Sequence, residues 1–370
     1  MIKPKTHLYY LLLLVCIIVT SPACRASLTT TSQEYSGVIY YQDRNGIWKV
    51  GARDKQALLL ASEVTDSFMY LSPDQKWLSY IVYTFEDERK LLSLWVASTR
   101  DPFSMQVSNK VPSLKSDWLE NGVLLYTEYP DFYIDYDVGQ AKFGDGITRT
   151  FDPETSEHQL TPQLQPKVLD PSKCRPWLAP AGYDDMAETC RYMPNGDLLR
   201  VVDIDGSNPI TVATPYRRGG IDWSSDGDKL AFANLNDSLG IQHLFVWNRW
   251  DGSIQQITKR DLQREYDFIA LSWSPDSQWI SFHNGGNGLC VIRVEDGEIT
   301  CFEGYVSAFG TKPAWSPDSR AIVLSSNRIG RLLMGDTDLI WDLFIISIPD
   351  GNVVRVTDSP EMESEPVWGW

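Results

Sequence analysis

Histidine is the side chain in this sequence best suited to acid–base chemistry and metal binding near neutral pH. Of the four histidines, His158, His243 and His283 lie well beyond the first residues of the chain. None of them belongs to a His-Glu-x-x-His motif, and no Gly-x-Ser-x-Gly nucleophile elbow occurs. His243 precedes a predicted strand and His283 ends one, so we interpret both as polar rim residues. The sequence therefore predicts no catalytic residue and no metal site.

An acidic and aromatic stretch is the main candidate for ligand binding. It consists of Asp131, Tyr133, Asp135, Tyr136 and Asp137 together with the residues between them. Interleaved carboxylates and rings can hold a cation or a basic ligand; the alternative is a solvated loop that covers the edge of the fold. We expect Arg328 and Arg331 on the same face, where they can meet an anionic group.

Residues 203–208 superficially resemble a calcium-binding loop. No glutamate follows at the spacing that such a loop requires, so we interpret the segment as a hairpin turn. Calcium stays open as a ligand, and we expect no cofactor.

The composition favours a sheet protein with an acidic surface. The chain contains 14 Trp, 17 Tyr and 13 Phe, and aromatic side chains suit pleated, half-buried surfaces. Its formal net charge of −16 repels phosphate backbones and anionic headgroups, which argues against nucleic acid as a partner. A basic partner is compatible with this charge.

The N-terminus is typical of an export signal. Lys3 and Lys5 precede the apolar residues 8–19, a stretch too short to span a bilayer as a helix. The end of this segment resembles a bacterial lipoprotein signal, with Cys24 as the lipid attachment site and Ser21 as a departure from the usual pattern. We predict a signal peptide over residues 1–23 and a linker over 24–34. Simple cleavage after Ala23 or Ala26 is the alternative.

Four further cysteines form two near-neighbour pairs, as expected of disulfides in an oxidising compartment. The first pair is Cys174 and Cys190. The second, Cys290 and Cys301, flanks a turn and can face across a hairpin. The alternative is four buried free thiols.

A repeated phrase defines the fold. Its clearest copies, at 70–80, 222–232, 272–282 and 314–324, combine an aromatic or leucine anchor, a Ser-x-Asp turn and an alternating strand. A second hairpin follows three of these copies, turning at Asp251-Gly252, Asp296-Gly297 and Asp350-Gly351. Two hairpins per repeat give four antiparallel strands, which is one propeller blade.

Counting the anchors of the first strands sets the number of blades. They are Leu71, Trp118, Trp177, Trp223, Trp273, Trp315 and Trp368. The last anchor has no strands after it, whereas residues 37–60 supply three strands with none before them. We therefore predict an all-β, seven-bladed β-propeller over residues 35–370, closed by pairing of the N- and C-terminal strands. Six or eight blades are the alternatives.

We predict that the connections between the second and third strands of the blades bind the ligand. Several are long, and long loops on a rigid scaffold commonly bind ligands. We expect them at 84–90, 129–146, 234–242 and 326–342.

With its repeated Trp-Ser-Pro-Asp phrase and Asp-Gly hairpins, the chain resembles TolB-like propeller repeats, which also occur in prolyl-oligopeptidase-type peptidases. The resemblance covers residues 35–370 and is specific for fold rather than function. We expect no counterpart of the N-terminal domain of TolB or of the hydrolase domain of the peptidases. We expect a monomeric, non-catalytic protein of the cell envelope or exterior that binds a protein, peptide or glycan and reaches the membrane only through a lipid anchor. The alternative is a propeller enzyme with its site in the central channel.

Overall fold

The computed structural model describes residues 35–62, 69–86, 89–109, 117–118, 122–128, 133–135, 140–142, 147–160, 174–177, 185–190, 197–203, 210–216, 220–235, 242–258, 268–284, 288–302, 312–326 and 341–370. The chain divides into two compact units, Met1–Tyr35 and Ser36–Trp370, and the second is described below. The predicted signal peptide, Cys24 and the linker lie outside the described residues. Within the described part, no helix has the length and apolarity needed to cross a membrane.

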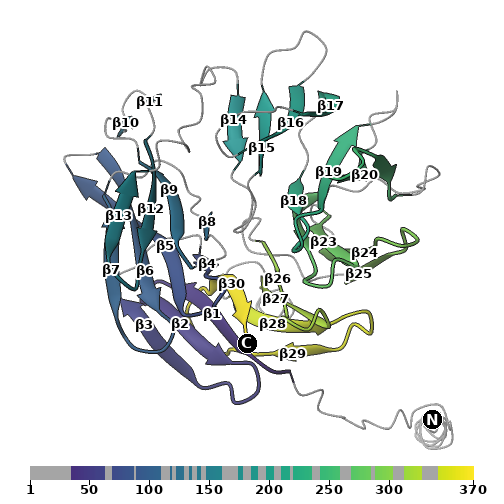
Figure 1. The fold of residues 1–370 in the computed structure, drawn as a ribbon. Helices are drawn as coiled ribbons and strands as arrows, with labels where there is room; N and C mark the ends of the chain where they lie inside the picture. The colour runs from purple at the N-terminus through teal and green to yellow at the C-terminus, as the bar shows by residue number, and fades with distance from the viewer. Residues whose placement is uncertain are drawn as a thin grey trace, which may run out of the picture. The chain divides into compact units, whose positions relative to one another are not determined.

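Every regular element of the described residues is a β-strand, and the strands form seven antiparallel sheets (Figure 1). Sheet A contains β30 (Ser364–Gly369), β1 (Val38–Asp43), β2 (Gly46–Gly51) and β3 (Ala57–Ser62). Sheet B contains β4 (Met69–Leu71), β5 (Trp77–Glu86), β6 (Arg89–Ser98) and β7 (Ser104–Ser108), extended by β10 (Tyr133–Asp135) and β11 (Gln140–Lys142). Sheet C contains β8 (Asp117–Trp118), β9 (Leu124–Glu128), β12 (Ile147–Asp152) and β13 (Glu157–Leu160).

The other four sheets each take four strands that are consecutive in the chain. Sheet D contains β14 (Cys174–Trp177), β15 (Asp185–Cys190), β16 (Asp197–Asp203) and β17 (Ile210–Tyr216). Sheet E contains β18 (Ile221–Trp223), β19 (Lys229–Leu235), β20 (Gln242–Asn248) and β21 (Ile254–Gln256). Sheet F contains β22 (Ile269–Trp273), β23 (Trp279–His283), β24 (Leu289–Arg293) and β25 (Ile299–Phe302), and sheet G contains β26 (Ala314–Trp315), β27 (Ala321–Ser326), β28 (Asp342–Ser347) and β29 (Val353–Arg355).

The Ser-x-Asp phrase forms the turn between the first and second strands. A buried serine hydroxyl donates to the aspartate two residues later and accepts the backbone N–H five residues later, so the turn has internal partners for its polar groups. The Ser–Asp distances are 2.5 to 2.7 Å in the pairs Ser72–Asp74, Ser224–Asp226, Ser274–Asp276 and Ser316–Asp318.

The tryptophan anchors join neighbouring sheets. In three of them the indole N–H donates to the carbonyl of the residue that precedes the anchor in the sheet before it. The bonds measure 2.9 to 3.0 Å and run from Trp118 to Tyr70, from Trp273 to Asp222 and from Trp315 to Ser272. Because an indole N–H is costly to bury without an acceptor, this bond explains why tryptophan recurs at the position.

The two ends of the second unit share sheet A. β1 pairs with β30 in a register that places Ile39 opposite Trp368, and the Trp368 indole donates to the Ser36 carbonyl at 3.1 Å. Gly37, at φ +100°, allows the close approach, because a Cβ atom there would lie 2.2 Å from the Gly369 carbonyl oxygen.

The hydrophobic core is divided among the spaces between sheets that are consecutive in the chain. Leu244, Val246 and Ile257 of sheet E, for example, pack with Phe282 and Ile292 of sheet F. Similar clusters join sheets A and B, B and C, D and E, and F and G. Full burial of one such side chain stabilises the fold by roughly 1.5–3 kcal/mol.

Candidate functional site

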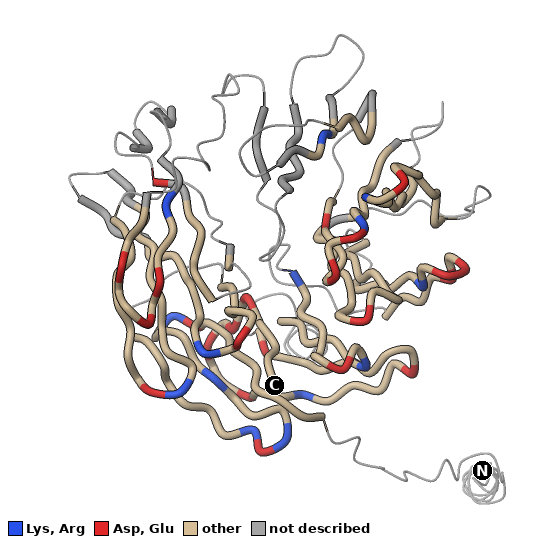
Figure 2. Tube along the Cα trace, viewed as in Figure 1, with Lys and Arg blue, Asp and Glu red and all other residues tan. Residues whose placement is uncertain are grey.

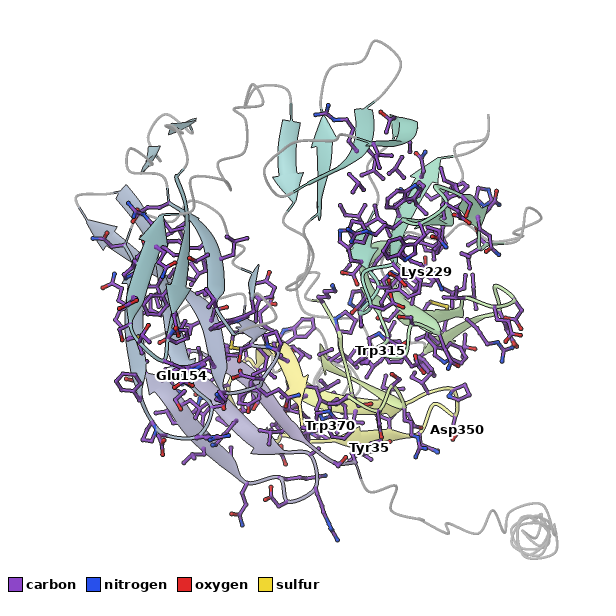
Figure 3. The ribbon with its side chains drawn as sticks, viewed as in Figure 1. Tyr35, Glu154, Lys229, Trp315, Asp350 and Trp370 are labelled. Carbon is purple, nitrogen blue, oxygen red and sulfur yellow. A yellow bond between two sulfur atoms is a disulfide. The ribbon has the colours of Figure 1, made fainter. Side chains whose placement is uncertain are left out.

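The two ends of each sheet differ in their connections. In a four-stranded antiparallel meander, the first and third turns lie at one end, which we call the turn side. The second connection and the exit to the next sheet lie at the other end, which we call the loop side. Asp350 at the tip of the β28–β29 hairpin marks the turn side of sheet G, and acidic residues also occupy the tip of the β24–β25 hairpin (Figures 2 and 3).

The predicted binding stretch is partly a strand. Tyr133 and Asp135 lie in β10, which pairs with β11 and places Ile134 opposite Lys90 of β6. The expected loop at 129–146 therefore contains a hairpin that extends sheet B, because alternating aromatic and β-branched residues favour a strand. The other candidates, Asp131, Tyr136, Asp137, Arg328 and Arg331, lie outside the described residues.

Two further sequence expectations are corrected. The connection at 84–90 is not a long loop, because β5 and β6 stay paired as far as Glu86 and Arg89. His243 lies within β20, and both His243 and His283 are buried rather than exposed at the rim. β20 begins before the hydrophobic pattern does, because polar partners inside the fold form hydrogen bonds with the ring of His243.

An ion pair occupies the loop-side end of sheet G. Asp342 begins β28 and is 2% exposed, and its Oδ2 accepts a hydrogen bond from Arg355 Nη2 at 2.6 Å. Arg355 also contacts the exposed Asp358 at 2.6 Å. Burial raises the pKa of Asp342 although Arg355 opposes the shift. Burial thus outweighs the neighbouring guanidinium.

Glu363 is the second buried carboxyl group at this end, 2% exposed just before β30. Ser359 Oγ donates to its Oε1 at 3.0 Å, and the Thr357 hydroxyl donates to its Oε2. Burial raises the pKa of Glu363 to about 7, the two hydroxyl groups oppose the shift, and the charge of Asp342 adds to it. This carboxyl group therefore titrates near neutral pH.

Sheet A completes the surroundings of Glu363. Burial, followed by the charges of Glu363 and Asp43, raises the pKa of the Tyr41 hydroxyl. Asp43 accepts the backbone N–H groups of Asn45 and Gly46 at 2.7 and 3.0 Å, which closes the β1–β2 turn. Arg44 in the same turn pairs with Glu361. We call Ser325, Trp341, Thr357, Ser359 and Glu363 the Glu363 junction, because Glu363 contacts all of the other four.

Sheet E contains a counterpart of this arrangement that uses a histidine and a glutamine. Thr258 accepts the Leu244 N–H at 3.2 Å, as Thr357 accepts the Leu343 N–H at 2.9 Å. His243 takes the place of Asp342, and its Nδ1 lies 3.0 Å from Thr258 Oγ1 and 3.2 Å from Gln256 Nε2. Gln256 takes the place of Arg355, because each lies opposite a phenylalanine of the third strand.

The cysteine pairs lie opposite one another in their hairpins. Cys290 and Cys301 face across β24 and β25 and are joined by a disulfide. Cys174 and Cys190 are register partners across β14 and β15, and their side chains lie outside the described residues.

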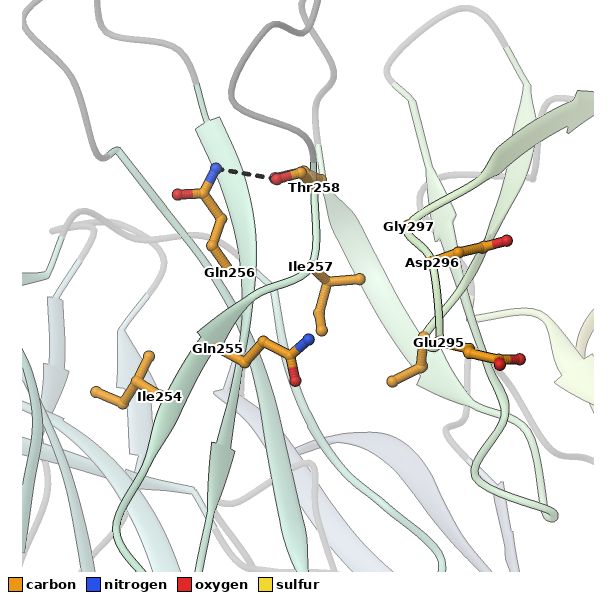
Figure 4. A pocket seen from close by; sticks show the side chains of 9 residues that line it. Ile254, Gln255, Gln256, Ile257, Thr258, Glu295, Asp296 and Gly297 are labelled. Atoms are coloured by element: carbon orange, nitrogen blue, oxygen red, sulfur yellow. Dashed lines mark hydrogen bonds between the residues drawn. The ribbon is translucent and has the colours of Figure 1, made fainter.

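A shallow groove of about 560 Å³ separates β21 from the β24–β25 turn. Gln255 and Ile257 line one wall, while Glu295 and Asp296 on the other wall point away from them (Figure 4). The groove thus lacks converging polar groups, and the loop side of sheets G and A is the stronger candidate.

The class of protein follows from these sheets: the chain has a TolB-like β-propeller fold. TolB from Acinetobacter baumannii superposes with a TM-score of 0.50 at 12% identity, over 90% of this chain and 67% of that one. No protein-family model matches the sequence, and no curated protein matches it.

Enzymes share the fold. An oligogalacturonate lyase in complex with manganese superposes with a TM-score of 0.56 at 15% identity, covering 82% of this chain and 83% of that one. The acylaminoacyl peptidase of Pyrococcus horikoshii gives 0.54 at 14% identity over 88% of this chain, which spans only 51% of the peptidase. At these identities the likeness concerns the fold alone.

Sequence reasoning missed Asp342 and Glu363. The sequence contained a signal for Asp342, since Gln256-Ile257-Thr258 and Arg355-Val356-Thr357 are similar segments that each begin with the last residue of a fourth strand. Aligning them points to Asp342 as the partner of Arg355. Glu363 has no equivalent in that alignment, because it comes from the following sheet.

Proposed function

We propose that this chain is a non-catalytic binding or scaffold propeller of the cell envelope or exterior that recognises a protein, peptide or glycan on its loop side. One observation carries the proposal. Four described loop-side carboxyl groups, those of Asp43, Glu128, Asp342 and Glu363, each accept hydrogen bonds from the protein itself. These hydrogen bonds maintain the shape of the surface, as a recognition scaffold requires.

A closed ring of seven blades supports this role by fixing the loops rigidly. Sheets A to G each supply one blade, and the pairing of β1 with β30 supports closure at sheet A. Packing between consecutive sheets and the bond from Ser325 to the Glu363 carbonyl support the same arrangement. Closure leaves no exposed inner edge for unwanted strand pairing.

The charge of the chain limits the partner. A net charge of −16 favours a basic protein or peptide, or a neutral glycan, over polyanions. Export through residues 1–23 and lipid attachment at Cys24 place the protein at the cell envelope in this proposal; secretion without the anchor is the alternative.

An enzyme of the central channel is the second candidate, favoured by the lyase and peptidase that share the fold. It requires acids or histidines on the innermost strands. Asp222 of β18 is such an acid, but its two oxygens accept Lys312 Nζ at 2.6 Å and the Trp273 N–H at 2.9 Å. Both oxygens are therefore occupied within the protein.

Site-specific photocrosslinking in the native cell envelope tests the proposal. Photoreactive residues at the exposed loop-side positions Arg44 and Asp358 are compared with turn-side controls at Glu154 and Asp350. We expect one partner to crosslink from the loop-side positions only, and excess unlabelled protein to compete with it. Equal labelling from the turn side, or turnover of a small substrate by the purified chain, contradicts the proposal.

A further inference from the structure

Glu363 joins three segments of the chain that belong to sheet G. Its backbone N–H donates to the Trp341 carbonyl at 3.0 Å, and its own carbonyl accepts the Ser325 hydroxyl. Its carboxyl group accepts from Thr357 and Ser359. Glu363, which lies just before β30 of sheet A, thereby forms hydrogen bonds with three parts of sheet G: the end of β27, the start of β28 and the segment after β29.

The charged and titratable groups around this carboxyl group are predominantly acidic. They come from β28, from β29 with the segment after it, and from the β1–β2 hairpin, while β27 contributes uncharged serines. The set is Asp342, Arg355, Asp358, Glu361, Tyr41, Asp43 and Arg44. Asp342 and Asp358 share Arg355 Nη2, and Glu361 pairs with Arg44, so among the described residues neither arginine of this set forms an ion pair with Glu363.

We propose that the Glu363 junction is a proton-controlled latch between sheets G and A, closed while the Glu363 carboxyl group is neutral and loosened when it ionises. The latch does not depend on any ligand, and it goes beyond the function proposed above. Its chemistry is the gain or loss of one proton at the carboxyl group, with solvent as the acceptor or donor.

Both protonation states have a physical description. When neutral, the carboxyl group can donate its proton to Ser359 Oγ while it still accepts from Thr357. When ionised, it places a second negative charge beside Asp342 in a buried site, where repulsion is weakly screened. Repulsion between the two charges then weakens the bonds that hold the segment after β29.

Asp342 has an alternative partner available. Ser326 lies directly opposite Asp342 in the β27–β28 register, on the same face of sheet G, and its buried hydroxyl has no hydrogen-bond partner among the described residues. In the proposed open state the Asp342 carboxylate turns toward this hydroxyl. The open state is thus a second arrangement that the change of charge would select.

Sheet E shows what the latch requires. Its threonine bonds to His243 of the same sheet, and the group beside His243 is the neutral Gln256. The amide of Leu244 is thus a matched reference for the amide of Leu343, since both donate to a threonine hydroxyl at the same place in the sheet.

Hydrogen exchange of the full chain, measured at about pH 5.5 and about pH 8 and corrected for intrinsic rates, tests the proposal. In this proposal, opening of the junction is linked to ionisation of a carboxyl group with a pKa of about 7, so the junction opens more readily at the higher pH. We therefore expect the protection factors of the Leu343, Val356 and Glu363 amides to fall on the order of tenfold at the higher pH. The matched amides of Leu244 and Ile257 are followed in the His243→Gln background, which removes the titratable ring from that corner, and there their protection stays constant. In Glu363→Gln, which cannot ionise, the pH response at the junction disappears.

Two outcomes overturn the latch: equal pH responses at Leu343 and Leu244, or a response that persists in Glu363→Gln. Asp342→Asn provides a second variant if Glu363→Gln does not fold, because it keeps Glu363 but removes the repulsion. The latch predicts a smaller pH response in Asp342→Asn, and an unchanged response contradicts it.

Discussion

Sheets E and G build the same loop-side corner from different chemistry. In both, a threonine after the fourth strand accepts the N–H of a leucine in the third strand. In sheet E a histidine and a glutamine complete the corner within one sheet, whereas sheet G uses a buried Asp342–Arg355 pair and a carboxyl group from sheet A. The repeat thus fixes the backbone, and the side chains set the chemistry of each corner.

Removing the arginine of the charged corner is expected to have the largest effect. Arg355→Ala leaves Asp342 buried without its ion-pair partner, so we expect a loss of about 3 kcal/mol in the free energy of unfolding. Gln256→Ala removes the hydrogen bonds of an uncharged amide and costs about 1 kcal/mol. Urea denaturation at neutral pH measures the free energy of unfolding of both variants. Equal losses in Arg355→Ala and Gln256→Ala would contradict the distinction between the two corners.

The pH dependence of stability gives the next largest effect. The folded pKa of Glu363, about 7, lies above its ordinary value of 4.5, so its contribution is fully present below 4.5 and is lost as pH rises through about 7. We expect the free energy of unfolding to fall by about 2–3 kcal/mol between these limits on account of this group. Glu363→Gln removes that part of the slope. A variant with the slope of the wild type speaks against the assignment.

The two threonines sharpen the comparison. Thr357→Val and Thr258→Val each leave a leucine N–H without its acceptor and cost about 1–2 kcal/mol. Only Thr357→Val also removes a donor to Glu363, so its cost should grow above pH 7; the cost of Thr258→Val, measured in the His243→Gln background, should not. Thermal unfolding across pH measures the difference. Parallel pH profiles for the two variants contradict the role given to Thr357.

The turns of the repeat give the smallest expected effect. Sheet E has Gly227 at φ 69°, where sheets F and G have Ser277 at 56° and Ser319 at 61°. Ser277→Gly relieves a left-handed conformation and should stabilise by up to about 1 kcal/mol. Ser319→Gly should gain less, because the Ser319 hydroxyl accepts the Asp276 N–H at 3.0 Å. The reverse order of melting temperatures would show that this bond contributes nothing.

The blade pattern could be predicted from the sequence because each sheet repeats a local code. The seven predicted anchors, from Leu71 to Trp368, all lie in the first strands of their sheets, at or next to the strand end. Turn residues and alternating strands act over a few positions, so a single sequence displays them. The pairing of the N-terminal strand β1 with the C-terminal strand β30 followed from counting strands.

The candidate site was less accessible to sequence reasoning. The Glu363 junction combines Ser325, Trp341 and Glu363 through contacts between two sheets, and no local spacing encodes such a meeting. His243 was interpreted as a rim residue because burial of a polar ring depends on partners such as Thr258, fifteen residues away. The contacts of polar groups at sheet junctions can therefore be found only from coordinates, whereas anchors and turns can be predicted from the sequence.

Direct titration of the glutamate carboxyl carbons by nuclear magnetic resonance tests the central claim. We predict that one glutamate signal, absent from Glu363→Gln, titrates with a midpoint near 7 and that its midpoint falls in Asp342→Asn. If the signal lost in Glu363→Gln titrates near 4.5 instead, Glu363 is an ordinary charged side chain and the account of the junction is contradicted.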